Sequence, residues 1–298
     1  MDIPWRISSV PEVRSVLLHE KVSVPLAYLA AAGQTRPQDM PEDVRGQLVY
    51  DRKVARNLAA GELFWVSADM TTLALDAAHD VPGFTPLTDL PALHGVMVLE
   101  KALPALKTWI FVRDHRRHEI ALSVDVLSWT VLEGMVYIES FARGGGIPDR
   151  LQENAFEPVH YFRGRADKFF AADSPTVDTD SNLLMQFLAA AAHLMANPAV
   201  AERSKITPKT PAARKAAKKG HPSTVTVVDL RAPKHVETGE KSETGRTYTH
   251  RWIVRGHWRN QPHGKDRAQR RITWVPSYTK GPAGAPLKET ERVWVWRR

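Results

Sequence analysis

The stretch LFWVSADMTTLALDAA, residues 63–78, indicates most clearly how this chain folds. Leu63 to Val66 is a short apolar run of the kind that forms a buried strand. Ser67 follows it directly, and a serine in this place accepts a backbone N–H at the start of a helix. The residues after Ser67, as far as about His79, carry apolar side chains at helical spacing. The stretch therefore predicts a strand, a cap and a helix in that order.

The segments on either side predict an α+β fold. Three segments before the stretch carry apolar residues at helical spacing: 10–18, 25–32 and 41–60. Four segments after it are rich in β-branched and aromatic residues: 96–99, 108–112, 119–129 and 131–140. A long apolar helix is predicted at 180–195, ending at Asn197-Pro198. We expect a helical N-terminal region together with an antiparallel sheet.

The composition is that of a globular chain, with 298 residues, 43% hydrophobic and 25% charged. No run approaches the ~18 uninterrupted apolar residues of a membrane helix, and the first residues lack the pattern of a secretory leader. We therefore expect a soluble, cytoplasmic protein without a membrane partner. The absence of cysteine excludes disulfides, thiolate zinc sites, iron–sulfur clusters and cysteine nucleophiles. We expect no metal and no cofactor.

Charge is divided unevenly along the chain. Residues 201–298 hold 23 Lys and Arg against 8 Asp and Glu, a net +15, although the whole chain carries only +8. A basic segment of this kind is typical of a protein that meets a polyanion, because each neutralised phosphate releases counterions. We therefore predict an acidic α+β body at 1–198, a basic flexible linker at 199–222 and a basic, Trp-rich β module at 223–298.

The run His250-Arg-Trp-Ile-Val-Arg-Gly-His-Trp-Arg259 is predicted to be a strand with one apolar and one cationic face. Alternation sends Trp252, Val254 and Trp258 to one face, which we expect to pack on Trp274, Val293 or Val295. It sends Arg251, Arg255 and Arg259 to the other, in a row that suits phosphate groups. Cations interleaved with aromatic residues are typical of single-strand binding, so RNA is the partner we expect.

The predicted nucleic-acid-binding residues are the cations of this module together with one tryptophan and one histidine. They are Arg251, Arg255, His257, Trp258, Arg259, Lys265, Arg267, Arg270, Arg271 and Lys280. The alternative for the same residues is an outward strand face with solvated arginines that prevent aggregation.

The module also resembles known proteins in five short runs. These are Arg255-Gly-His-Trp-Arg259, QPHGKDR at 261–267, Trp274-Val-Pro276, Lys280-Gly-Pro282 and Ala285-Pro-Leu287. They resemble the C-terminal module of a broad group of phage and mobile-element proteins, and residues 64–78 are similar to that group as well. The group includes a type V anti-CRISPR family that lowers expression of its Cas nuclease at the messenger level during translation. The resemblance implies a mobile-element regulator or counter-defence protein that engages RNA or a nascent chain, and it implies no catalytic residues.

Two other functions fit the same residues. One is a protein-interaction inhibitor or scaffold, in which the tryptophans anchor an interface and the basic face meets an acidic partner. In the main hypothesis, too, the N-terminal body supplies recognition of a protein target. The other is a metal-independent ribonuclease, for which His257 with His263 or with Lys280 would supply proton transfer and charge stabilisation.

Overall fold

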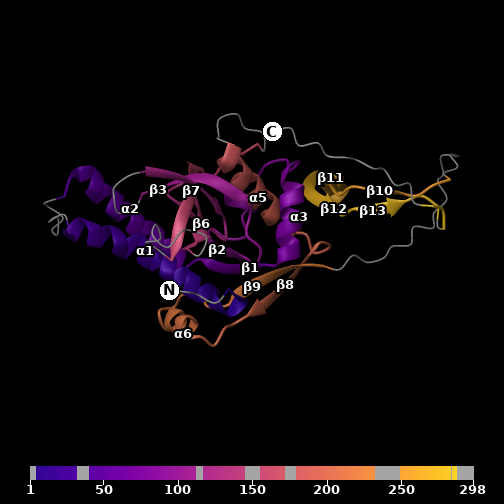
Figure 1. The fold of residues 1–298 in the computed structure, drawn as a ribbon. Helices are drawn as coiled ribbons and strands as arrows, with labels where there is room; N and C mark the ends of the chain where they lie inside the picture. The colour runs from indigo at the N-terminus through magenta and orange to yellow at the C-terminus, as the bar shows by residue number, and fades with distance from the viewer. Residues whose placement is uncertain are drawn as a thin grey trace. The chain divides into compact units, whose positions relative to one another are not determined.

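The computed structural model describes residues 5–31, 40–111, 117–144, 155–171, 179–231, 249–282 and 284–286. The chain forms two compact units, Met1–Leu230 and Arg231–Arg298, which we call the body and the hairpin unit. The described part of the body contains α-helices, a seven-stranded sheet and a separate two-stranded sheet, and that of the hairpin unit contains two two-stranded sheets (Figure 1). The α+β fold predicted from the sequence is confirmed.

The large sheet of the body has the strand order β7-β6-β5-β2-β1-β9-β8. Its strands are β1 (Glu62–Val66), β2 (His94–Leu99), β5 (Val126–Leu132), β6 (Met135–Arg143), β7 (Phe156–Arg165), β8 (Ala201–Ile206) and β9 (Val225–Leu230). The antiparallel arrangement predicted from the sequence holds for β2, β5, β6 and β7. In contrast, β1 runs parallel to both of its neighbours, β2 and β9.

The stretch at 63–78 forms the predicted elements. Strand β1 ends at Val66, and the Ser67 hydroxyl accepts a hydrogen bond from the Met70 amide, 3.4 Å away, at the start of α3 (Ala68–Ala78). The chain passes through α3 and the short helix α4 (Pro86–Asp89) before it returns as β2. A helical crossover of this length places β2 parallel to β1, which the sequence prediction of an antiparallel sheet missed.

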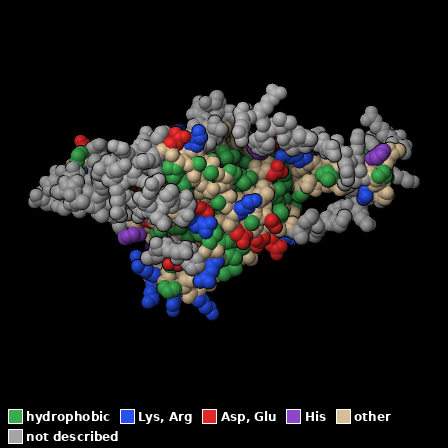
Figure 2. Space-filling model, in the orientation of Figure 1, with side chains coloured by type: hydrophobic (Ala, Val, Ile, Leu, Met, Phe, Trp, Pro, Cys, Tyr) green, Lys and Arg blue, Asp and Glu red, His purple; other side chains and the backbone are tan. Residues whose placement is uncertain are grey.

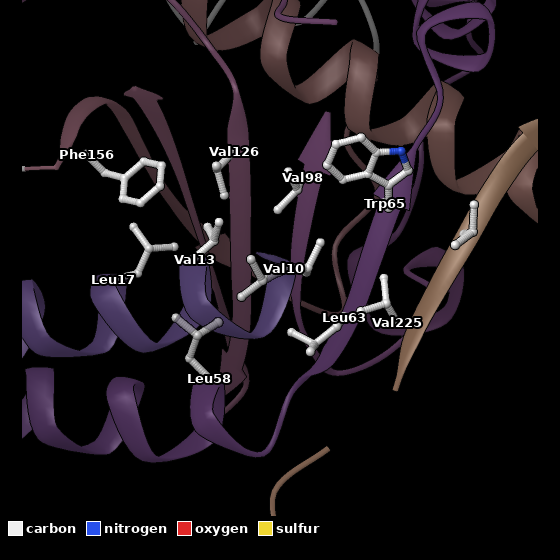
Figure 3. Packing of buried hydrophobic residues seen from close by; sticks show 12 residues of the cluster. Val10, Val13, Leu17, Leu58, Leu63, Trp65, Val98, Val126, Phe156 and Val225 are labelled. Carbon is white, nitrogen blue, oxygen red and sulfur yellow. The ribbon is translucent and has the colours of Figure 1, made fainter. Parts of the chain in front are cut away.

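Two N-terminal helices pack on one face of the sheet. A 3₁₀ turn, η1 (Ile7–Ser9), leads into α1 (Val10–Ala31), a single helix that covers two of the predicted segments, and α2 (Glu42–Ala59) covers the third. Side chains of α1 and α2 point toward β1, β2, β5 and β9 and form a buried cluster with them (Figure 3). Alternate strand residues, such as Leu63 and Trp65, belong to this cluster.

The other set of alternate strand residues is buried on the opposite face, with α3 and α5 (Thr179–Met195). Trp129 is fully buried there, and its ring lies over Gly95 on the neighbouring strand, where a Cβ atom would stand 2.3 Å from Cζ2 of the indole. Helix α5 is the helix predicted at 180–195, and it ends before Asn197-Pro198 as expected. The body is therefore a sheet between two helical layers.

Two predicted strands of the body are interrupted. The segment 119–129 is divided between β4 (Arg117–Ser123), which pairs with β3 (Ala105–Phe111) in the separate hairpin, and β5. The segment 131–140 contains the turn between β5 and β6, where Glu133 and Gly134 both have positive φ. Positive φ at both central residues is the geometry of a tight β-hairpin.

The prediction of a basic flexible linker at 199–222 is wrong. This segment contains β8, an edge strand of the large sheet, and α6 (Pro211–Lys218). The next strand, β9, lies inside the sheet between β1 and β8. The boundary between the two units therefore falls at Leu230 rather than near residue 198. The prediction failed because alanine and lysine are poor core residues but good helix formers, and a helix can dock through alanine alone.

Candidate nucleic-acid interface

The predicted strand at 250–259 is interrupted at Arg255-Gly256. It forms β10 (Trp252–Val254), which pairs with β13 (Tyr278–Lys280), and β11 (His257–His263), which pairs with β12 (Gln269–Val275). Gly256 is buried against the Trp274 ring, since a Cβ atom there would stand 2.5 Å from Cζ2 of the indole. Only glycine fits this position, so the strand breaks where the indole crosses it.

The predicted apolar face is built around a pair of tryptophans. Trp258 on β11 stands directly across from Trp274 on β12, with ring centroids 5.0 Å apart in an edge-to-face arrangement. Trp274 is only 4% exposed and Trp258 is half-buried. The contact with Trp274 is the one predicted from the sequence, whereas Val293 and Val295 lie outside the described residues.

The opposite face of the same two strands is cationic. Register places His257, Arg259 and His263 of β11 on this face together with Arg271 of β12, and all four side chains are exposed. Arg255, just before β11, is exposed as well. We call these five residues the cationic face.

The single row of three arginines expected from one continuous strand is not formed. Arg251 is half-buried: its Nε donates to the Ala285 carbonyl at 2.7 Å, and its backbone amide donates to the Pro286 carbonyl at 2.8 Å. Arg251 therefore fixes residues 285–286 against the start of β10. Arg255 and Arg259 keep the exposed positions predicted for them.

The remaining predicted cations occupy the far end of the β11–β12 hairpin and the other small sheet. Lys265 and Arg267 are exposed in the 3₁₀ turn η4 (Lys265–Arg267) that connects β11 to β12, and Arg270 lies on the tryptophan face by register. Lys280 of β13 stands across from Trp252, with Nζ 6.0 Å from the centroid of the indole. This cation–π contact places a cation and an aromatic ring side by side.

The described residues of the hairpin unit carry almost no compensating acid. Between residues 249 and 286 there are eight Lys and Arg but one acidic residue, Asp266. Two apolar or aromatic side chains are also exposed there, Ile253 at 64% and Tyr278 at 44%. The unit thus combines unbalanced positive charge with accessible rings.

The geometry separates the two histidines of the nuclease hypothesis. His257 and His263 share a face, but they stand at opposite ends of β11. Six residues of extended strand place them about 20 Å apart, well beyond the reach of two groups that exchange protons with one scissile phosphate. The His257 Nδ1 atom lies 3.2 Å from the Arg255 carbonyl.

Other kinds of site find little support in the parts of the chain that the structure describes. No group of three or more His, Asp or Glu side chains there is placed to hold a metal ion. Two small pockets lie against α5 in the described part of the body. One is closed by the sheet and lined by Ile138, Phe162 and Met185, and the other is lined by Phe84 and Phe170. Within the described ranges, no helix has the length and apolar character needed to span a bilayer.

One group of cations forms an exposed surface that was not predicted from the sequence. Arg214, Lys215, Lys218 and Lys219 were assigned to a linker, whereas they are exposed on and just after α6. The signals for this helix were present in the sequence: Thr210-Pro211 is typical of a helix start and Gly220 of a helix end.

Comparison with known proteins shows a distant similarity to a solved structure. No family model matches the chain, and no curated protein matches it. Among solved structures, the chain is similar to the crystal structure of AcrVA2, with a TM-score of 0.40 and 15% sequence identity over 88% of this chain and 85% of that one. A similarity of this size carries no argument about function.

Proposed function

We propose that this protein binds single-stranded RNA through the hairpin unit. The proposal is supported by the charge of residues 249–286, which include eight Lys and Arg but one acidic residue. The small sheets in this range also carry tryptophans. Binding to such a surface releases the counterions of the phosphates, which makes the affinity strongly dependent on salt.

The residue types suit this role. Arg255 and Arg259 are exposed, and a guanidinium binds a phosphate through two parallel hydrogen bonds or stacks on a base. Tyr278 and the half-buried Trp252 supply rings on which unpaired bases stack without regard to sequence. The cations thus hold the backbone while the rings hold the bases.

We further propose a biological setting for this binding. The resemblance of the runs at 255–287 to a module of phage and mobile-element proteins supports a regulatory or counter-defence role, with a messenger or a nascent chain as the target. In this reading the hairpin unit engages the RNA and the body recognises a protein.

A protein partner is the second candidate function. Ile253 at 64% exposure is the observation that favours it, because a large exposed aliphatic residue is more useful in a protein interface than against RNA. The distance between His257 and His263 prevents their joint action on one phosphate, which counts against a ribonuclease that uses these two histidines.

Charge reversal in the full-length protein tests the proposal. The variant Arg255→Glu/Arg259→Glu is compared with a matched body variant, Arg45→Glu/Arg52→Glu, for binding to a fluorescent oligouridine by anisotropy. We expect the hairpin variant to lose at least about tenfold in affinity and the body variant to stay close to the wild type. Equal affinities for all three proteins would refute RNA binding by the hairpin unit. To separate binding from cleavage, the wild type and His257→Ala are each incubated with oligouridine in EDTA. Intact oligouridine after both incubations would show that the protein binds the RNA without cleaving it.

A further inference from the structure

The body carries a second basic surface, which belongs to α6 and differs in chemistry from the hairpin unit. Residues 203–228 contain seven Lys and Arg and no Asp or Glu. In Figure 2, Lys and Arg side chains gather over the position that α6 occupies in Figure 1. Arg214, Lys215, Lys218 and Lys219 are exposed there, and we call them the α6 cations.

Helix α6 is short but held firmly at both ends. The Thr210 hydroxyl accepts from the Ala213 amide at 3.2 Å, and Pro211 occupies the first turn. At the other end, Gly220 has φ +72°, its amide donates to the Ala217 carbonyl at 3.0 Å, and the His221 amide donates to the Ala216 carbonyl at 3.0 Å. These two bonds form a Schellman motif, so the helix has a defined length and direction.

The helix is also fixed to the rest of the body. Its buried residue is Ala213, and α6 packs against α1. Just beyond its end, the Pro222 carbonyl accepts a hydrogen bond from the buried guanidinium of Arg14 on α1, with Nη2 2.5 Å away. The α6 cations therefore stand on a preorganised platform, which lowers the entropic cost of binding.

Helical geometry places the four α6 cations on one side of the helix. Arg214 and Lys218 are four residues apart, as are Lys215 and Lys219, while the alanines Ala212, Ala213 and Ala216 occupy the other side, toward the body. Like charges at this spacing destabilise a helix. Within the described residues none of the four forms an ion pair. Lys215 and Lys218 lie in the last turn, where cations complement the helix dipole. That contribution does not require four neighbouring cations, and a cluster of like charges is typical of a functional surface.

Edge protection does not explain these charges. Arg203 and Lys205 lie on the edge strand β8, where charged side chains prevent pairing with another sheet. The α6 cations are on a helix, which has no open edge. Their charge is complementary to a polyanion.

We infer that the α6 cations bind the phosphate backbone of double-stranded RNA. No Phe, Tyr or Trp occurs between positions 203 and 228, so this surface lacks the large rings on which single strands stack. Duplex RNA is recognised mainly by its shape and phosphates, and one turn of α6 separates Arg214 from Lys218 by about 6 Å along the axis, a spacing that suits successive phosphates. This inference concerns the body alone and goes beyond the function proposed for the hairpin unit.

The test neutralises the α6 cations in the full-length protein with Arg214→Gln/Lys215→Gln/Lys218→Gln/Lys219→Gln. Glutamine keeps the helix propensity close to that of lysine. The matched control removes four exposed cations elsewhere in the body, by Arg45→Gln/Arg52→Gln/Arg56→Gln/Lys101→Gln. The probe is a blunt fluorescent RNA duplex of about 16 base pairs, titrated at several KCl concentrations.

We expect the α6 variant to lose at least about tenfold in duplex affinity, and the negative slope of log K against log salt to become shallower by about 3 to 4. We expect the control to keep the wild-type slope and the α6 variant to melt no earlier than the wild type. Wild-type affinity in the α6 variant, an equal loss in the control, or binding of the wild type to vesicles of anionic lipid but not to the duplex would overturn the inference.

The two proposals fail independently. If Arg255→Glu/Arg259→Glu leaves oligouridine binding unchanged while the α6 variant loses the duplex, the proposed function is wrong and the inference stands. The opposite pattern, with oligouridine binding lost in the hairpin variant and duplex binding intact in the α6 variant, overturns the inference alone.

Discussion

Gly256 is the residue on which the packing of the hairpin unit most directly depends. The break in the predicted strand falls at this position. Less exposed and more exposed residues nevertheless alternate from Trp252 to Arg259, and Gly256 is one of the buried residues in this alternation. Alternation in the sequence therefore predicted which side chains are exposed there. It could not predict the break, which depends on an indole that arrives from another strand.

Replacing Gly256 with alanine should disrupt the tryptophan pair. The added methyl group would overlap the Trp274 ring, and overpacking of this kind costs about 1–3 kcal/mol. We expect the exciton signal of Trp258 and Trp274 in circular dichroism to weaken. Gly46→Ala is the matched control, because no atom lies within 4 Å of a Cβ at Gly46 on α2 and alanine should stabilise the helix by about 1 kcal/mol. An unchanged exciton signal in Gly256→Ala would contradict the packing described for this residue.

His94, at the start of β2, gives the body a pH-dependent contribution to stability. Burial lowers the pKa of its imidazole below the ordinary value, so the unfolded chain takes up a proton at higher pH than the folded protein does. The stabilisation is complete above the unfolded pKa, about 6.5, and decreases as the pH falls below it.

The variant His94→Gln should remove this dependence. Urea denaturation measures the free energy of unfolding of both proteins. We expect any excess of the wild type over the variant in this free energy to become smaller as the pH falls from about 7.5 to 5. A constant difference between the two proteins would show that His94 titrates alike in the folded and unfolded states. A difference that grew on acidification would show that its pKa is raised in the folded state, and either result would contradict the lowered pKa.

At the scale of elements, one buried arginine connects three parts of the body. Arg14 on α1 is 2% exposed, and it donates to the Gly61 carbonyl before β1 at 3.1 Å as well as to the Pro222 carbonyl after α6. Burial lowers the pKa of this guanidinium to about 10. No local pattern in the sequence predicts this role, because the three segments are far apart in the chain.

Arg14→Met should destabilise the body by about 2 to 3 kcal/mol, since two buried carbonyl groups lose a charged donor. Thermal unfolding measures the effect. Arg56→Met, an exposed position on α2, should change the melting temperature little. Equal melting temperatures for the two variants would show that Arg14 does not fix α1 to the neighbouring segments.

The elements differ in how far the sequence could predict them. Strand β1, the Ser67 cap and α3 were correct because their signals are local. The parallel pairing of β1 was missed since it depends on a crossover, and α6 was missed because its alanines bury so little surface. Local patterns thus predicted element types well, whereas pairing and docking arise from distant contacts.

At the scale of the whole molecule, the charge asymmetry was the most useful feature of the sequence, but it was assigned to the wrong parts. Part of the positive charge of residues 201–298 belongs to the body, on β8 and α6, and the rest belongs to the hairpin unit. Charge summed along a chain cannot show this division, because β8 and β9 belong to the body sheet. Two basic surfaces of different chemistry follow from it.

The central claim is that the hairpin unit is where single-stranded RNA binds. Photo-crosslinking of the full-length protein to 4-thiouridine RNA, followed by mass spectrometry of the peptides, locates the contact directly. We predict adducts between residues 249 and 286, at the exposed Tyr278 or at Trp252 and Trp258, which disappear in Arg255→Glu/Arg259→Glu. Adducts confined to the body, or none that excess unlabelled RNA competes away, would contradict the claim.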